Sequence, residues 1–164
     1  MTVTLPTAQV AAELLGLEQS YQSGGLDRAQ DKRWGHLVNA LIRNLCANER
    51  NRKNLRIPTR GDAVLHRARS HFRCVVDDLS HFGIGISGTL GRLSVGDKVC
   101  VSQLNVGGEQ LDLSIDCRVA WIEQVAPRKR RAGLQLTNID PVARTDYFRA
   151  LYYPAYLNYL RSLC

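Results

Sequence analysis

The chain has 164 residues, of which 45% are hydrophobic, and its 22 basic and 15 acidic side chains give a formal net charge of +7. This composition is typical of a globular protein, and since no apolar run approaches the ~18 residues of a membrane span, we expect no transmembrane helix. The five cysteines are odd in number and lack Cys-x-x-Cys spacing, which favours reduced thiols in the cytoplasm over a disulfide framework or a zinc site.

Two helices are predicted in the N-terminal part of the chain. Residues 7–19 carry apolar side chains at helical spacing after Pro6, and the sequence Ser23-Gly24-Gly25 ends that segment. From Trp34 to Leu45 the apolar residues recur three and four positions apart, which predicts an amphipathic helix. We therefore assign residues 1–49 to an N-terminal helical segment.

From about residue 60 the hydrophobic period changes to two, the spacing of strands. Short alternating segments separated by glycine-containing turns are typical of an antiparallel barrel rather than of a parallel sheet with crossover helices. The predicted strands fall at residues 66–77, 82–86, 98–104, 111–121 and 132–137. We assign residues 50–140 to this β-domain.

The C-terminal residues 141–164 return to a helical pattern. Asp140 is a suitable N-cap and Pro141 a suitable first helical residue, whereas Pro154 is expected to kink or divide the helix. Five of the six tyrosines lie here, which indicates packing on the β-domain, on the N-terminal helices or on a protein partner. A homodimer through the helices is one prediction of this pattern.

Motifs for catalysis are missing from the sequence. It holds no P-loop, no His-Glu-x-x-His and no Gly-x-Ser-x-Gly, and its four histidines are dispersed. The run Gly83–Gly88 matches Gly-x-Gly-x-x-Gly, but no amphipathic helix follows it to bind a pyrophosphate. We expect neither an enzyme nor a metal site, and no catalytic residues.

Two segments do carry binding chemistry. Four arginines lie between Arg50 and Arg60, where several forked guanidinium groups can surround phosphates. The second segment is Asp78-x-Ser80-x-x-Gly83, in which an acceptor and a hydroxyl two residues apart point the same way from an extended chain. Such a pair can meet the edge of a nucleotide base.

Together these segments resemble the paired signature of PilZ domains. Arg52-x-x-x-Arg56-Ile57-Pro58 is followed 22 residues after Arg56 by Asp78-x-Ser80-x-x-Gly83. The resemblance implies a six-stranded antiparallel barrel with flanking helices that binds cyclic di-GMP. It also implies that Arg52 and Arg56 clamp phosphates and stack on guanines, while Asp78, Ser80 and Gly83 meet the guanine from the barrel surface.

Two positions around the signature need separate treatment. Many family members have adjacent basic residues before the first motif arginine, whereas here Asn51 precedes Arg52 and Arg50 is one position further away. We include Arg50 among the predicted ligand contacts. Some members place a large residue late in the barrel against a guanine, and Trp121 is the candidate here, although strand alternation puts it on the same face as the apolar Val119.

The predicted function is therefore that of a cytoplasmic bacterial receptor for cyclic di-GMP, without a further cofactor. We expect it to change conformation on binding and to signal to an unidentified downstream protein in motility, exopolysaccharide and biofilm, or virulence control. One alternative is a basic barrel that binds nucleic acid, but few aromatic residues are available on the strands for base stacking. Another is a PilZ-like adaptor that acts only through protein contacts.

Overall fold

The computed structural model of the chain describes residues 5–46, 54–112, 114–137 and 141–164. Residues Met1–Leu55 and Tyr156–Cys164 form one unit, and Arg56–Ala155 form the other. The division into 1–49, 50–140 and 141–164 stays a prediction. Within the described residues, no helix combines the length and the apolar character needed to cross a membrane.

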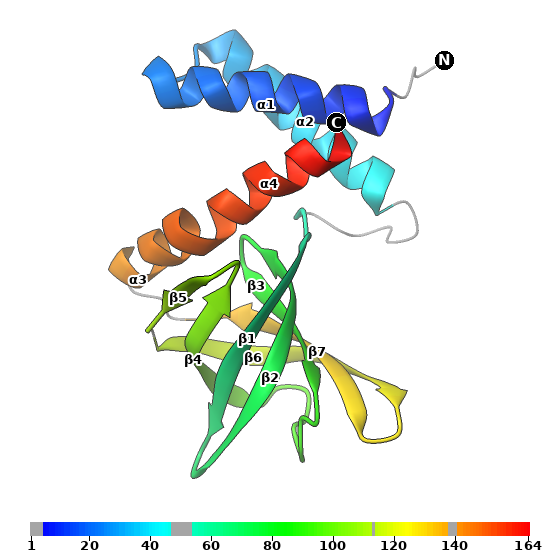
Figure 1. Ribbon diagram of the computed structural model, residues 1–164, viewed down its shortest axis with the longest axis vertical. Helices are drawn as coiled ribbons and strands as arrows, with labels where there is room; N and C mark the ends of the chain where they lie inside the picture. The colour runs from blue at the N-terminus through cyan, green and yellow to red at the C-terminus, as the bar shows by residue number, and fades with distance from the viewer. Residues whose placement is uncertain (1–4, 47–53, 113, 138–140) are drawn as a thin grey trace. The chain divides into compact units, whose positions relative to one another are not determined.

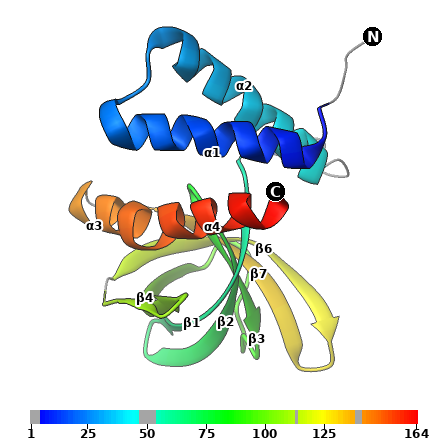
Figure 2. The same cartoon turned by 45° about the horizontal axis from the view of Figure 1, so that its top comes forward.

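The first unit contains the helices α1 (Thr7–Gly24) and α2 (Arg28–Leu45), which run side by side (Figures 1 and 2). Asp27 caps α2 by accepting a hydrogen bond from the Gln30 backbone N–H at 2.8 Å, and the Gln30 side chain accepts one from the Asp27 N–H at 3.0 Å. Leu37 and Leu41 on the predicted apolar stripe are buried. Both predicted helices are present, and α2 begins before Trp34 because Asp27 supplies its cap.

The second unit holds seven antiparallel strands in the order β1-β2-β3-β7-β6-β4-β5. Because β1 also pairs with β4, six of them close into a ring, and the short β5 extends from β4 (Figure 2). The six-stranded antiparallel fold is confirmed. The strands are β1 (Ile57–Arg67), β2 (Ser70–Ser80), β3 (Gly83–Gly88), β4 (Lys98–Val106), β5 (Glu109–Leu111), β6 (Ile115–Ala126) and β7 (Lys129–Leu136).

Two strand predictions differ from the structure. The segment 66–77 is not one strand, because β1 and β2 meet there in a tight hairpin in which Ala68 adopts a φ of 52°. No glycine, proline or asparagine marks this turn, so the sequence gives no sign of it. The predicted strand over 111–121 is likewise divided, since β5 ends at Leu111 and β6 begins at Ile115.

The interior of the ring is filled by the inward-facing residues of each strand, such as Leu65, Val76, Ile84, Val101 and Leu134, all at most 2% exposed. Successive side chains of a strand point to opposite faces, so the residues between these positions face outward. The outward faces of β2, β3, β7 and β6 form the surface that carries the candidate site.

The C-terminal part begins with α3 (Pro141–Asp146), continues as a π-helix, η1 (Tyr147–Tyr152), and ends in α4 (Tyr153–Leu163). Pro141 opens the first helix as predicted, and its predicted cap Asp140 lies outside the described residues. The predicted interruption near Pro154 takes the form of the π-helix directly before it. A proline ring clashes with the carbonyl four residues earlier in a regular α-helix, and the wider turn avoids that contact.

Candidate functional site

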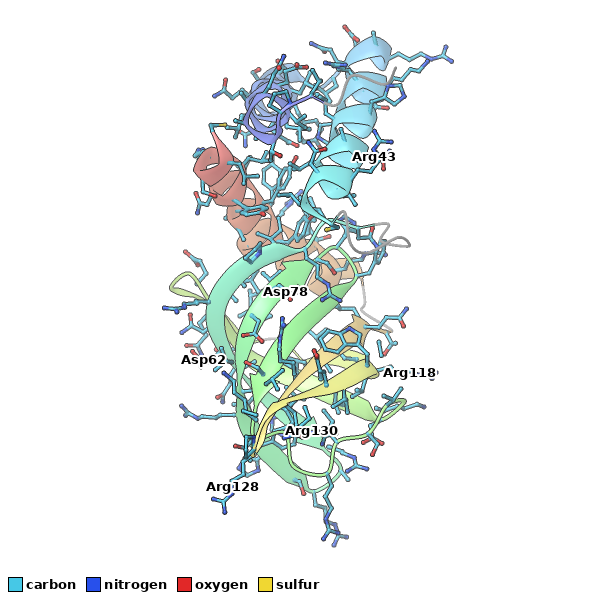
Figure 3. The ribbon with its side chains drawn as sticks, turned by 90° about the vertical axis from the view of Figure 1, so that its right-hand side faces the viewer. Arg43, Asp62, Asp78, Arg118, Arg128 and Arg130 are labelled. Atoms are coloured by element: carbon cyan, nitrogen blue, oxygen red, sulfur yellow. The ribbon has the colours of Figure 1, made fainter. Side chains whose placement is uncertain are left out.

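The outer face of the ring carries a row of four residues, one from each of four neighbouring strands. Asp78 on β2 pairs with Gly85 on β3, Gly85 with Gly133 on β7, and Gly133 with Trp121 on β6. Figure 3 shows Asp78 toward the Ser80 end of β2, and Arg128 and Arg130 toward the other end of the ring. An acid and an indole therefore flank two positions that have no side chain.

The two glycines are required by how closely their neighbours lie. A Cβ at Gly85 would stand 2.3 Å from Asp78 Oδ2, and a Cβ at Gly133 would stand 2.1 Å from Trp121 Nε1. Both distances are far below the ~3.5 Å of ordinary contact, so each flanking side chain lies directly over the backbone of the next strand. The glycines thus form a flat floor on which the Asp78 carboxylate and the Trp121 ring lie.

A β-bulge turns Asp78 toward this face. The pairing of β2 with β3 shifts between Val76 and Asp78, which places one additional residue in β2. That residue, Asp77, accepts a hydrogen bond from Ser87 Oγ at 3.0 Å and has Arg131 Nε 3.8 Å from its Oδ2. Both carboxylates therefore lie on the outer side of the ring, where neighbouring side chains cover Asp78 to 8% exposure.

A second bulge does the same for Trp121. The pairing of β6 with β7 shifts between Val119 and Trp121, so regular alternation stops there. Val119 is buried at 1% exposure, whereas Trp121 is half-buried on the outer face over Gly133. The expectation that Trp121 shares a face with Val119 is wrong because it assumes an unbroken alternation.

Arg56, directly before β1, lies between the two flanking side chains. Its Nε is 3.7 Å from Asp78 Oδ1, and its guanidinium carbon is 5.4 Å from the centroid of the Trp121 ring. An ion pair and a cation–π contact thus hold one arginine over the glycine floor. Its side chain is 30% exposed, so the guanidinium group stays accessible from solvent.

The turn between β2 and β3 borders the row. Ser80 Oγ donates a hydrogen bond to the Gly83 carbonyl at 3.3 Å, and the Leu136 N–H donates to the Phe82 carbonyl at 2.9 Å. A Cβ at Gly83 would lie 2.8 Å from the Leu134 carbonyl oxygen, so the turn packs closely on β7. Ser80 is thereby fixed beside the floor.

A family comparison matches residues 50–153 to the PilZ domain. This chain belongs to the PilZ domain family.

Several solved structures resemble the chain at low sequence identity. The Bacillus subtilis inhibitor of motility is 17% identical, with a TM-score of 0.50 over 63% of this chain and 49% of that one, so the match spans about half of its length. The PilZ domain of YcgR from Escherichia coli, solved with c-di-GMP, is 18% identical, with a TM-score of 0.49 over 63% of this chain and 91% of that one. At an identity below 25%, the likeness to the Bacillus subtilis protein shows a shared fold alone. No curated protein matches the sequence.

The structure brings most of the residues expected from the PilZ signature to one face. Arg56, Asp78, Ser80, Gly83 and Trp121 all lie on or beside the row. The predicted contacts Arg50 and Arg52 lie outside the described residues.

Three residues of this PilZ surface were missed by sequence reasoning. Gly85 is part of the Gly-x-Gly-x-x-Gly run, whose spacing serves a strand face here and not a dinucleotide turn. Gly133 lies in the closing strand β7, and the bulge in β6 hides its pairing with Trp121 from a reading of the sequence. Tyr147 contacts the Ser80–Gly83 turn from far along the chain, and no pattern in the sequence signals it.

The chemistry available elsewhere in the PilZ ring is limited. Among the described residues, no group of three histidine, cysteine, aspartate or glutamate side chains could hold a metal ion. Burial raises the pKa of the Cys74 and Cys117 thiols to about 12, with smaller contributions from nearby acidic groups. Both thiols therefore stay protonated and are poor nucleophiles.

Proposed function

We propose that this chain is a receptor for cyclic di-GMP and that the ligand binds at the surface formed by Arg56, Asp78 and Trp121. Its membership of the PilZ family supports this function. The observation that carries the assignment to this surface is the position of Arg56 between an acid and an indole above two glycines. The planar Trp121 ring, which lies flat on β7 at Gly133, offers a stacking surface for a planar base.

The side chains on and beside the row match features of the ligand. A guanidinium group can donate two hydrogen bonds to O6 and N7 of guanine and can also stack on the base. The Asp78 carboxylate accepts hydrogen bonds from the N–H groups of guanine, and the Trp121 ring offers a stacking surface. The Ser80 hydroxyl can donate to the ligand or accept from it.

Ligand binding requires Arg56 to exchange partners. Its guanidinium group is shared between Asp78 and Trp121 in the structure, and both of these side chains are proposed to contact the base in the complex. Arg50 and Arg52 are proposed to bind the two phosphates of the ligand. The hydrogen bonds that a guanidinium group donates to a phosphate are strong because both groups are charged.

The chain is proposed to act without catalysis, by presenting a changed surface to a downstream protein when the ligand is bound. A cytoplasmic location, a homodimer through the helices, and control of motility, biofilm or virulence all stay predictions. The ligand can shift the equilibrium with a partner only by its differential affinity for the two states.

Isothermal titration of cyclic di-GMP into the full chain tests the proposal. We expect binding by the wild type, and a clear loss of affinity in Arg56→Ala and Asp78→Ala. Arg67→Ala is a matched control, because Arg67 pairs with Asp97 at 3.0 Å near the opposite end of β1 and has a similar exposure of 39%. Cyclic di-AMP should bind weakly, because it keeps both phosphates but lacks the O6 acceptor of guanine.

Absence of heat with folded, nucleotide-free wild type overturns the function. Equal affinity in Arg56→Ala, Asp78→Ala and Arg67→Ala overturns the assigned surface. Salt-dependent binding of a single-stranded oligonucleotide without cyclic di-GMP binding would instead support the nucleic-acid alternative.

A further inference from the structure

The Ser80–Gly83 turn is held from beneath by one tyrosine of the C-terminal segment. The Tyr147 hydroxyl lies 2.9 Å from the Ser80 carbonyl oxygen and 3.3 Å from the Gly83 carbonyl oxygen. Ser80 and Gly83 are two of the residues at the proposed ligand surface. A single hydroxyl therefore contacts the backbone of both ends of this turn.

Tyr147 is suited to act as a permanent donor. Its side chain is 2% exposed, and it is among the largest fully buried side chains of the chain. Burial raises the pKa of this phenol well above its ordinary value, with smaller contributions from Tyr152, Cys117 and Asp78. The hydroxyl keeps its proton over the physiological pH range and is fixed in position by its packing.

The same turn contacts the C-terminal segment through its exposed side chains. The His81 ring packs edge-on against Phe148 at 5.4 Å and Tyr152 at 5.7 Å, both measured between ring centroids. The Arg144 guanidinium carbon lies 5.4 Å from the centroid of the Phe82 ring. Backbone and side chains of one turn thus contact α3 and η1 together.

We propose that Tyr147 is a positioning residue of the ligand site and that it couples occupation of Ser80 to the π-helix η1. This inference rests on the proposed cyclic di-GMP function. It assigns to the C-terminal segment a role in sensing the ligand that does not depend on direct contact with it.

The coupling follows from the hydrogen bonds at the Gly83 carbonyl. In the structure this oxygen accepts from Ser80 Oγ at 3.3 Å and has the Tyr147 hydroxyl at the same distance. When the ligand takes the Ser80 hydroxyl, this half-buried carbonyl loses that donor, and the single proton of the Tyr147 hydroxyl, which lies within reach of both carbonyl oxygens, turns toward Gly83. A partly buried carbonyl that loses a donor costs free energy, so the tyrosine stabilises the bound form selectively.

The π-helix is the element that this shift would move. Tyr147 is its first residue, and π-helical turns are rare and occur frequently at functional sites. Phe148 and Tyr152, which contact His81, belong to the same six-residue segment. A change in the hydrogen bonding of Tyr147 therefore acts at the start of η1. The contacts of Phe148 and Tyr152 with His81 keep η1 packed on the turn.

A double-mutant cycle with cyclic di-GMP titration tests this coupling. Tyr147→Phe removes the hydroxyl and keeps the ring, and we expect a roughly 2- to 10-fold loss of affinity, the range of one hydrogen bond. In a Ser80→Ala background no serine hydroxyl is released, so the same substitution should leave the affinity unchanged. Tyr159→Phe, a half-buried tyrosine of α4, is the control and should bind as the wild type.

Hydrogen exchange provides a second readout. Cyclic di-GMP should slow amide exchange in residues 147–152 of the wild type and should have no such effect in Tyr147→Phe. Wild-type affinity in Tyr147→Phe, or an equal loss in the Ser80 and Ser80→Ala backgrounds, overturns the inference while the proposed function stands. Absence of binding by the wild type overturns the proposed function and this inference together.

Discussion

The substitution Gly133→Ala tests how the binding surface is built without changing any polar side chain. The new methyl group would lie 2.1 Å from Trp121 Nε1 and 2.5 Å from Cε2, so the indole must retreat by more than ~1 Å to reach ordinary contact. Because Gly133 has no positive φ, the alanine suits the strand backbone, and we expect the domain to stay folded.

The magnitude follows from the contacts that the indole makes. Moving the ring weakens its stacking on the proposed base, worth about 1–3 kcal/mol. A loss of about 1–3 kcal/mol of stacking corresponds to a roughly 5- to 150-fold rise in Kd for cyclic di-GMP.

Calorimetric titration and Trp121 fluorescence measure the two consequences separately. Trp34, the second tryptophan, is replaced by Phe in all samples so that the emission reports Trp121 alone. Gly35→Ala is the control, because a Cβ at this position of α2 would meet no atom within 4 Å beyond the helix's own backbone, and it should leave the affinity unchanged. Unaltered affinity and emission in Gly133→Ala would refute the close stacking of the indole on β7.

Three further predictions concern other parts of the chain. Asp27→Ala removes the capping box of α2 and should lower the free energy of unfolding by about 0.5–2 kcal/mol in urea titration; an unchanged midpoint would contradict the role of the cap. Burial and a nearby guanidinium group lower the pKa of His81, so NMR titration should give a value below 6.5, and the contribution of this group to stability should be lost as the pH falls through that value; a pKa at or above 6.5 would contradict this. Native alkylation at pH 8 should label the exposed Cys164 and spare Cys74 and Cys117, whose thiols react only after unfolding; rapid labelling of either would contradict their burial.

The ring could be predicted from the sequence because its strands alternate strongly between apolar and polar residues. The motif residues were also found, since Arg56 and Asp78 have a spacing that can be read along the chain. The floor of the site was not predicted, because its glycines become neighbours only through the pairing of β3 with β7. Pairing across strands depends on register, which a local pattern does not determine.

Long-range contacts set the remaining limit. The face of Trp121 was assigned wrongly because a bulge changes the alternation, and no residue type marks it. Tyr147 lies 67 residues from Ser80, so the hydrogen bond between them is visible only in the folded chain.

Ala120 shows that cross-strand pairing, and not spacing along β6, decides which residue reaches the binding surface. It is the additional residue of the bulge, because Val119 pairs with Leu134 and Trp121 pairs with the preceding residue of β7, Gly133. A lineage that lost this one codon would join Val119 directly to the tryptophan, and regular alternation would then keep the indole on the outer face opposite Gly133. The stacking position of this surface is therefore defined by its partner glycine on β7 and not by a fixed number of residues after Val119.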